Sequence, residues 1–127
     1  MLYVSDSKIH EHGVFTNKEF KTNDTIELCP YLIIDEKDLG EDCILHNYAF
    51  SCPEENCSDF LIVLGMGMVY NHNSNPNAEW EVYEKDNRFI RFFALKPIQK
   101  GEEIFHDYGE EYWGTRPSLS KRKEEVK

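Results

Sequence analysis

The sequence has no long apolar run. None of its 127 residues belongs to a hydrophobic stretch close to the roughly 20 residues that are needed to cross a bilayer. The N-terminus also lacks a basic segment followed by a long apolar one, which is the pattern of a secretory signal. We therefore expect no membrane association, and we expect the protein to reside in the nucleus or the cytoplasm.

Cysteine is scarce and shows no metal-binding spacing. The four cysteines, Cys29, Cys43, Cys52 and Cys57, include no Cys-x-x-Cys pair. In a reducing compartment this pattern predicts free thiols. Zinc held by Cys52 and Cys57 is the alternative, but a structural zinc site usually draws on two close pairs of ligands and no second pair follows. We expect no bound metal.

Basic residues are outnumbered by acidic ones. The chain has 14 Lys and Arg against 24 Asp and Glu, a formal net charge of -10 at pH 7. Binding to a nucleic-acid backbone depends on clustered Lys and Arg, so this balance argues against direct nucleic-acid binding. A basic protein partner fits the charge better, although plain solubility explains it equally well.

Helical periodicity is thin, and short β-prone pieces dominate. With 40% hydrophobic and 30% charged residues, the chain has the composition of a globular protein, and its length suits one domain over 1–127 with a tail at about 119–127. The one expected helix covers 36–47, with Leu39, Cys43 and His46 facing inward. Strands are expected at 2–5, 13–16, 26–28, 31–34, 59–64 and 104–105.

The clearest alternation lies in residues 78–84, AEWEVYE. Ala78, Trp80 and Val82 fall on one face of a strand, and glutamates fall on the other. A turn at 85–87 and the apolar segment that follows predict a hairpin over 78–95. The predicted fold class is therefore mainly β, with many short strands and little helix.

An asparagine-rich stretch, NHNSNPN at 71–77, directly follows an apolar approach that contains no charge. A buried asparagine needs partners for both its donor and its acceptor, such as a crossing backbone or the edge of an adenine ring. Gly65 and Gly67 in the approach allow another group to come close. The alternative is an Asx-rich turn with no binding role.

A second cluster, KPIQKGEEIFHDYGEEYW at 96–113, ends in aromatic residues. Aromatic faces and phenol oxygens attract cations, which suits alkylammonium or sulfonium groups. A purely structural aromatic cluster is the alternative, since small β domains often contain one.

Together these segments resemble the SET-domain protein lysine methyltransferases. The motifs that carry the resemblance are EHGVF at 11–15, NHNSNPN at 71–77, GEEIFHDYG at 101–109 and YWGTRPSL at 112–119, and they span nearly the whole chain. Their order and spacing look most like the minimal viral histone methyltransferases of that family, which would put the protein in a host nucleus. The resemblance implies a SET-domain fold of several small sheets with a C-terminal pseudoknot, in which the Asn71 and Tyr108 segments cross.

The resemblance also implies a cofactor, S-adenosylmethionine, and a set of site residues. His12, Gly13, Phe15, Asn71, His72, Tyr108 and Trp113 would bind the cofactor. Tyr108 and Tyr48 would be catalytic. The channel for the target lysine would be lined by Tyr48, Tyr70, His106 and Tyr112.

Three positions depart from the family pattern. Glu11 stands where a glycine is usual, Asn73 replaces a serine, and His106 occupies a position often held by Phe or Tyr that influences how many methyl groups are added. The implied substrate is a basic protein, most simply a histone tail, and the viral proteins suggest a homodimer. The alternative function is a SET-fold module that binds a basic partner without catalysis.

Overall fold

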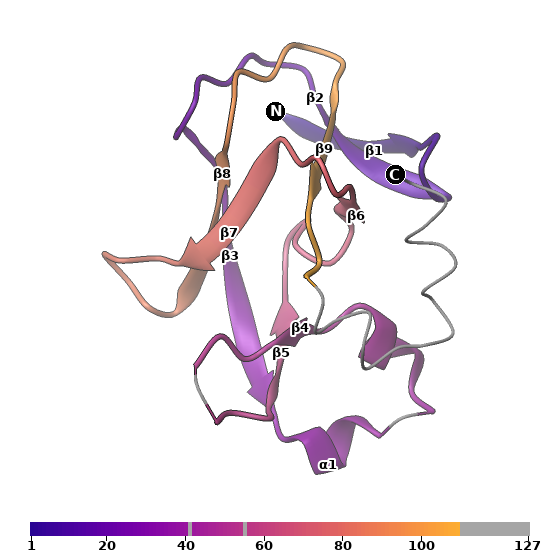
Figure 1. The fold of residues 1–127 in the computed structure, drawn as a ribbon, viewed down its shortest axis with the longest axis vertical. Helices are drawn as coiled ribbons and strands as arrows, with labels where there is room; N and C mark the ends of the chain where they lie inside the picture. The colour runs from indigo at the N-terminus through magenta and orange to yellow at the C-terminus, as the bar shows by residue number, and fades with distance from the viewer. Residues whose placement is uncertain (41, 55, 110–127) are drawn as a thin grey trace.

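The computed structural model describes residues 1–40, 42–54 and 56–109, which form two β-sheets (Figure 1). The four-stranded sheet has the order β1 (Leu2–Asp6), β2 (His12–Thr16), β9 (Glu103–His106) and β6 (Asn71–His72). The five-stranded sheet has the order β4 (Phe50–Ser51), β5 (Phe60–Val63), β3 (Thr25–Ile34), β8 (Phe89–Ala94) and β7 (Ala78–Val82). The prediction of a mainly β fold with several sheets is confirmed.

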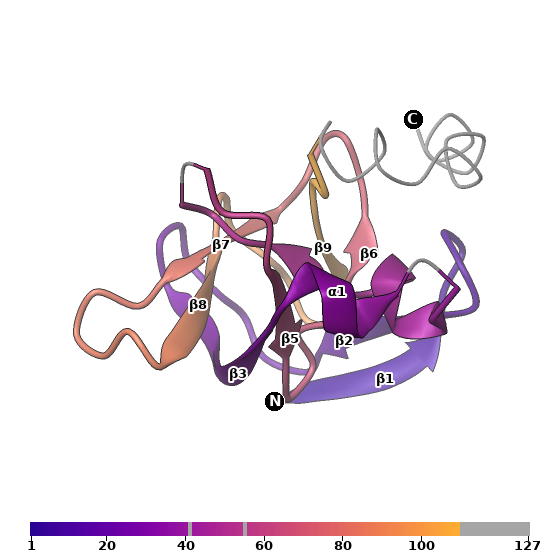
Figure 2. The same cartoon turned by 90° about the horizontal axis from the view of Figure 1, so that it is seen from below.

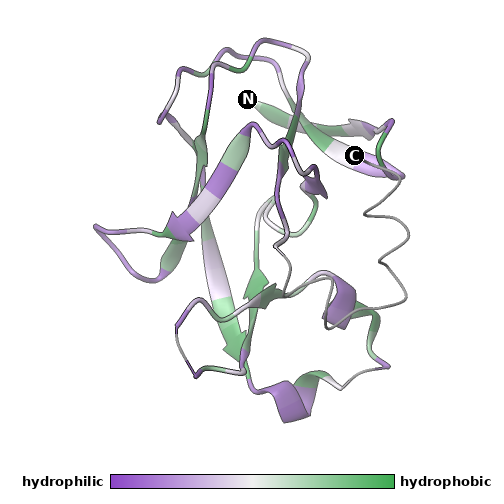
Figure 3. Ribbon diagram, viewed as in Figure 1, coloured by the Kyte–Doolittle hydropathy of each residue, from purple (hydrophilic) through white to green (hydrophobic). Residues whose placement is uncertain are grey.

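The predicted hairpin is confirmed as β7 and β8. Its register runs from Ala78 opposite Ala94 to Val82 opposite Ile90. Ala78 is buried, whereas Glu79 and Glu81 are exposed, and Figure 3 shows the corresponding change of hydropathy along β7. The two strands predicted at 26–28 and 31–34 are one continuous strand, β3, because Pro30 lies within its pairing with β8 and does not end it.

The predicted helix over 36–47 is wrong in its extent. Two separate pieces replace it, α1 (Glu36–Leu39) and the 3-10 helix η1 (Ile44–Asn47). Asp35 caps the start of α1 by accepting a hydrogen bond from the Lys37 N–H, and Gly40 ends the helix at φ 45, a conformation that suits glycine. Leu39 is buried and His46 partly buried as expected, but Cys43 is exposed. Neither piece, within the described chain, is long and apolar enough to span a bilayer.

Strand β9 lies between two strands, β2 and β6, that are far from it in the sequence (Figures 1 and 2). On one side it pairs antiparallel with β2, with Val14 opposite Ile104. On the other it pairs in parallel with β6, with Asn71 opposite Phe105. The predicted crossing of the asparagine-rich segment and the Tyr108 segment is therefore built on a parallel strand pair.

One main hydrophobic core is shared by the two sheets. Val14 and Ile104 enter it from the four-stranded sheet, and Ile90 and Phe92 enter it from the five-stranded sheet; all four side chains are fully buried. A smaller cluster of Leu39, Ala49 and Ile62 lies beside α1. Because β2, β8 and β9 pack into the same core, the residues directly before and after these strands are also held in place.

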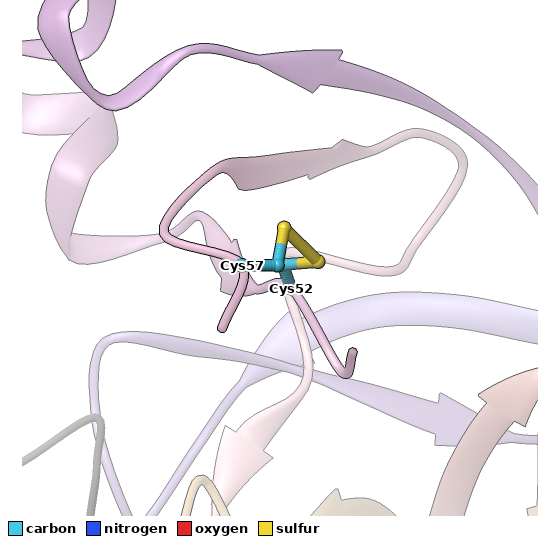
Figure 4. Close-up of a disulfide and its surroundings, with 2 residues drawn as sticks. All are labelled: Cys52 and Cys57. Atoms are coloured by element: carbon cyan, nitrogen blue, oxygen red, sulfur yellow. A yellow bond between two sulfur atoms is a disulfide. The ribbon is translucent and has the colours of Figure 1, made fainter. Parts of the chain in front are cut away.

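The prediction that all four cysteines are free thiols is wrong for two of them. Cys52 and Cys57 form a disulfide in the loop between β4 and β5 (Figure 4). The loop folds back on itself, because the Cys57 N–H donates to Glu54 O, and the two Cα atoms lie 5.8 Å apart, within bridging range. Cys29 and Cys43 are free. Among the described residues no group of three His, Cys, Asp or Glu side chains could hold a metal ion.

The disulfide predicts a thiol count. The denatured, unreduced protein should expose two reactive thiols to Ellman's reagent and the reduced protein four. The Cys52→Ser/Cys57→Ser double variant should lose about 2 kcal/mol of unfolding free energy, because the bridge restricts a short loop of the unfolded chain. Cys43→Ser, at the exposed thiol, is the control and should change stability by less than about 0.5 kcal/mol. Four reactive thiols without reductant would contradict the bridge.

Candidate active site

A cavity of about 580 Å³ lies where the crossing segments meet. Its walls come from residues 10–12, from η1 and β4, from residues 67–71, from β7 and from the end of β9. The predicted site residues that line it are His12, Tyr48, Tyr70, Asn71, His106 and Tyr108. Gly13, Phe15 and His72 are not among its described lining residues, and Tyr112 and Trp113 fall outside the described residues. Asn71 and Tyr108 therefore share one cleft.

Asn71 is buried, and its amide nitrogen ties β6 to the turn that precedes β2. Nδ2 lies 2.8 Å from His12 O, 3.3 Å from His10 O and 3.1 Å from Ser7 Oγ. It also lies 2.9 Å from Glu103 Oε2 on β9. The burial of an amide behind an apolar approach thus has a structural cause, because the side chain satisfies backbone acceptors that the turn leaves unpaired.

Glu103 is a site residue that the sequence analysis missed. Its carboxylate accepts hydrogen bonds from Ser7 Oγ at 2.7 Å and from Asn71 Nδ2. A Cβ on Gly13 would lie 2.2 Å from Glu103 Oε2, so a larger residue there would displace the carboxylate from its hydrogen bonds with Ser7 and Asn71. In the sequence, Glu103 is visible only as the second glutamate of the GEE motif. Its role depends on the pairing of β2 with β9, which places Phe15 opposite Glu103.

His72 supports Tyr108 from behind the cavity wall. Its Nδ1 accepts a hydrogen bond from the Tyr108 N–H at 3.0 Å, and the two rings lie 5.2 Å apart. Because Nδ1 acts as an acceptor, its proton must lie on Nε2 when the ring is neutral. His72 is 1% exposed, so its ring orientation is fixed by packing as well as by this bond.

The Tyr108 hydroxyl donates its proton to a backbone carbonyl. The distance from Tyr108 Oη to Tyr70 O is 2.7 Å. With the proton committed in this way, the phenol oxygen can act toward a ligand only as an acceptor. An oxygen lone pair in the lining of a cavity stabilises positive charge, which is the electrostatic property that a sulfonium site needs.

The cavity has an aromatic wall, which we define as Tyr48, Phe50, Trp80, His106 and Tyr108. The ring centroid of Phe50 lies 5.2 Å from that of Trp80 and 5.5 Å from that of His106. Phe50 was not predicted as a site residue, and Trp80 was predicted only as part of the inward face of a strand. A wall of this kind attracts alkylammonium groups while excluding water from around them.

Tyr70 differs from the other predicted channel residues, because its hydroxyl is hydrogen-bonded to another side chain of the protein. It donates to Glu27 Oε1 at 2.7 Å, and Glu27 Oε2 accepts a hydrogen bond from the Met66 N–H at 3.0 Å. Burial first and the Glu27 charge second raise the pKa of Tyr70 far above its ordinary value. The predicted close approach at Gly65 has the same origin, since a Cβ there would lie 2.5 Å from Glu27 Oε2.

His106 is a neutral base in an aromatic setting. Its ring lies 5.0 Å from that of Tyr108 and 5.7 Å from that of Phe92, and neither ring nitrogen has a hydrogen-bond partner among the described residues. Burial lowers the pKa of His106 from 6.5 to about 4. The imidazole therefore carries no charge at neutral pH.

This pKa predicts a loss of stability in acid. Below pH 6.5 the unfolded chain binds a proton at His106, whereas the folded chain stays neutral there until about pH 4, so acid favours unfolding across this window. Between pH 7 and pH 5 the wild type should lose roughly 2 kcal/mol more unfolding free energy than His106→Phe. Urea unfolding at both pH values measures the difference. Equal losses would contradict a buried neutral imidazole.

Comparisons with known proteins agree with the fold and the motifs. The SET domain profile matches residues 11–109. A Schizosaccharomyces pombe enzyme named histone-lysine N-methyltransferase, H3 lysine-37 specific, is 28% identical over 117 residues, which are 88% of this chain and 76% of that enzyme. The Arabidopsis thaliana histone-lysine N-methyltransferase MEDEA is 30% identical over 114 residues, which are 84% of this chain but 16% of MEDEA.

A solved structure shows the same arrangement. The crystal structure of a Plasmodium falciparum candidate histone methyltransferase superposes with a TM-score of 0.71 at 31% identity, over 87% of this chain and 98% of that one. These relatives are cellular, so the likeness to viral proteins stays a prediction. The profile match, the sheet order and the shared cleft lead to one conclusion, which is that the chain belongs to the SET-domain family.

Proposed function

We propose that the chain is an S-adenosylmethionine-dependent protein lysine N-methyltransferase that acts on a histone tail. The observation that carries the proposal is the single cleft shared by the backbone around His12, which Asn71 supports, and by the phenol oxygen of Tyr108. Its relatives are named histone-lysine N-methyltransferases, which supports both the reaction and the substrate class.

The residues present fit the cofactor. The cavity of about 580 Å³ is within the usual range for a ligand of that size, and residues 10–12 line it together with Asn71 and Tyr108. His12 would bind through backbone groups, and Asn71 and the buried Gly13 would support that backbone. When bound, S-adenosylmethionine supplies an electrophilic methyl group on a positively charged sulfur. Phe15 and His72 would support the cofactor site indirectly. Phe15 lies opposite Glu103 in the pairing of β2 with β9, and His72 accepts a hydrogen bond from the Tyr108 N–H.

The aromatic wall would prepare the target lysine. An ammonium has no lone pair, so the side chain must lose its proton before it can attack, and a desolvated channel lowers the pKa of a lysine. Tyr48 at the mouth is 43% exposed and can meet the incoming side chain, while Phe50 and Trp80 exclude water. With the partners aligned, positioning supplies most of the rate and no carboxylate base is needed.

The charge of the chain supports a basic substrate. A net charge of -10 favours the encounter with a Lys- and Arg-rich peptide through long-range attraction.

A nuclear location would follow from a histone substrate, and we propose in addition that the protein forms a homodimer. Light scattering coupled to size exclusion measures the assembly directly, and a monomer mass at working concentration contradicts the dimer.

Tyr108→Phe tests the reaction. Loss of the phenol oxygen should lower methyl transfer from labelled S-adenosylmethionine to core histones by about 100-fold, because the acceptor that faces the developing charge is removed. The matched control is Tyr31→Phe, since the Tyr31 hydroxyl also donates to a backbone carbonyl, that of Asn87 at 2.6 Å, but does so outside the cavity. Tyr31→Phe should lose similar stability and keep its activity.

Two outcomes contradict the proposal in different ways. Transfer that survives in Tyr108→Phe at the wild-type rate removes the phenol from the mechanism. Wild-type protein that binds S-adenosylmethionine yet methylates no histone or other basic protein supports the binding module without catalysis.

A further inference from the structure

Glu11 adopts a backbone conformation that its residue type disfavours. Its φ is 34, and the only other non-glycine residues with positive φ in the described chain are Asn23 and Asn56. Asparagine tolerates this region through local hydrogen bonds, whereas glutamate gains nothing there and glycine would adopt it without strain. The conformation must therefore be imposed by the surroundings.

The surroundings hold the peptides on both sides of Glu11. Asn71 Nδ2 binds the carbonyl of His10 at 3.3 Å and that of His12 at 2.8 Å. The Ser7 N–H donates to Glu11 O at 3.1 Å, and His12 is held opposite Asp6 by the pairing of β1 with β2. A strained residue that is fixed in this way inside a cavity wall points to a role for its side chain.

The side chain is the distinctive charge of the cavity. Among the described lining residues Glu11 is the only carboxylate, and no Lys or Arg accompanies it. Its Oε2 atom lies 3.9 Å from His10 Nε2, and the side chain is 70% exposed. The carboxylate is thus solvated and can turn to a cationic ligand at little cost.

We infer that the Glu11 carboxylate binds the α-ammonium group of the cofactor's amino-acid part, an inference that rests on the proposed function. The carbonyls of His10 and His12 each keep a lone pair beside their contact with Asn71, but an ammonium with three N–H donors binds more strongly where a fully charged acceptor stands beside them, and Glu11 supplies that acceptor. The sulfonium has no N–H to donate and is served instead by the Tyr108 oxygen. Glu11 is a cofactor-binding residue and takes no part in methyl transfer.

The test distinguishes binding of Glu11 to the ammonium group from binding to the sulfonium group. Isothermal titration calorimetry should show that Glu11→Gln binds S-adenosylmethionine and S-adenosylhomocysteine both about tenfold more weakly than the wild type, because both keep the ammonium and only the first has the sulfonium. The analogue of S-adenosylhomocysteine that lacks the amino group should bind the wild type and Glu11→Gln equally. Glu79→Gln, at an exposed carboxylate on β7, is the matched control and should bind as the wild type does.

Glu11→Gly gives a second, independent readout. Relief of the strained φ should raise the melting temperature of the ligand-free protein by roughly 3 °C, while cofactor affinity falls as in Glu11→Gln. Unchanged affinity of Glu11→Gln for S-adenosylhomocysteine overturns the inference. Weakened binding of S-adenosylmethionine alone also overturns it, because the carboxylate would then face the sulfonium. A wild type that binds neither compound overturns the proposed function together with this inference.

Discussion

The structure depends on one buried amide. Asn71 joins the turn before β2, the strand β6 and, through Glu103, the strand β9. Each of these segments is short, and β6 pairs over only two residues, so the strand pairing alone would not fix their relative positions. The two N–H groups of the Asn71 amide are shared among acceptors from different segments and hold these together, and an acceptor left buried and unpaired would cost about 1–3 kcal/mol.

The site follows from that crossing. Because β9 ends beside β6, the Tyr108 N–H reaches His72 and the Tyr108 hydroxyl reaches the Tyr70 carbonyl. Both groups of the same residue are thereby held, and the phenol oxygen lines the cavity as an acceptor. Functional groups are held here by backbone contacts of neighbouring strands, which suits chemistry that depends on positioning.

The sequence predicted the parts that have local causes. The alternation around Trp80 predicted the hairpin, and the isolated β-prone pieces predicted β1, β2 and β5 to within about one or two residues. The crossing and the family came from motif order, because the partners of Asn71 are more than 50 residues away in the sequence for Ser7, His10 and His12. Periodic patterns of apolar residues do not reveal contacts between residues so far apart in the sequence.

The missed features all depend on three-dimensional neighbours. A side chain at Gly13 would displace the Glu103 carboxylate, and Gly65 has a φ of 66 and Glu27 beside it, and neither pair is visible in local sequence. The Cys52–Cys57 bridge has a spacing outside the usual metal and redox motifs and forms because the loop folds back. The helix over 36–47 was interrupted by Gly40, whose conformation outweighed the apolar spacing.

The most direct measurement of the central claim is calorimetric binding of S-adenosylmethionine to Asn71→Asp, with Asn75→Asp as control. Aspartate has the shape of asparagine but donates no hydrogen bond, and it would place a negative charge beside Glu103 and two carbonyls. Asn75 is exposed and lies outside the cavity, so its variant should bind as the wild type does. We expect Asn71→Asp to lose cofactor binding. Wild-type affinity in Asn71→Asp would contradict it.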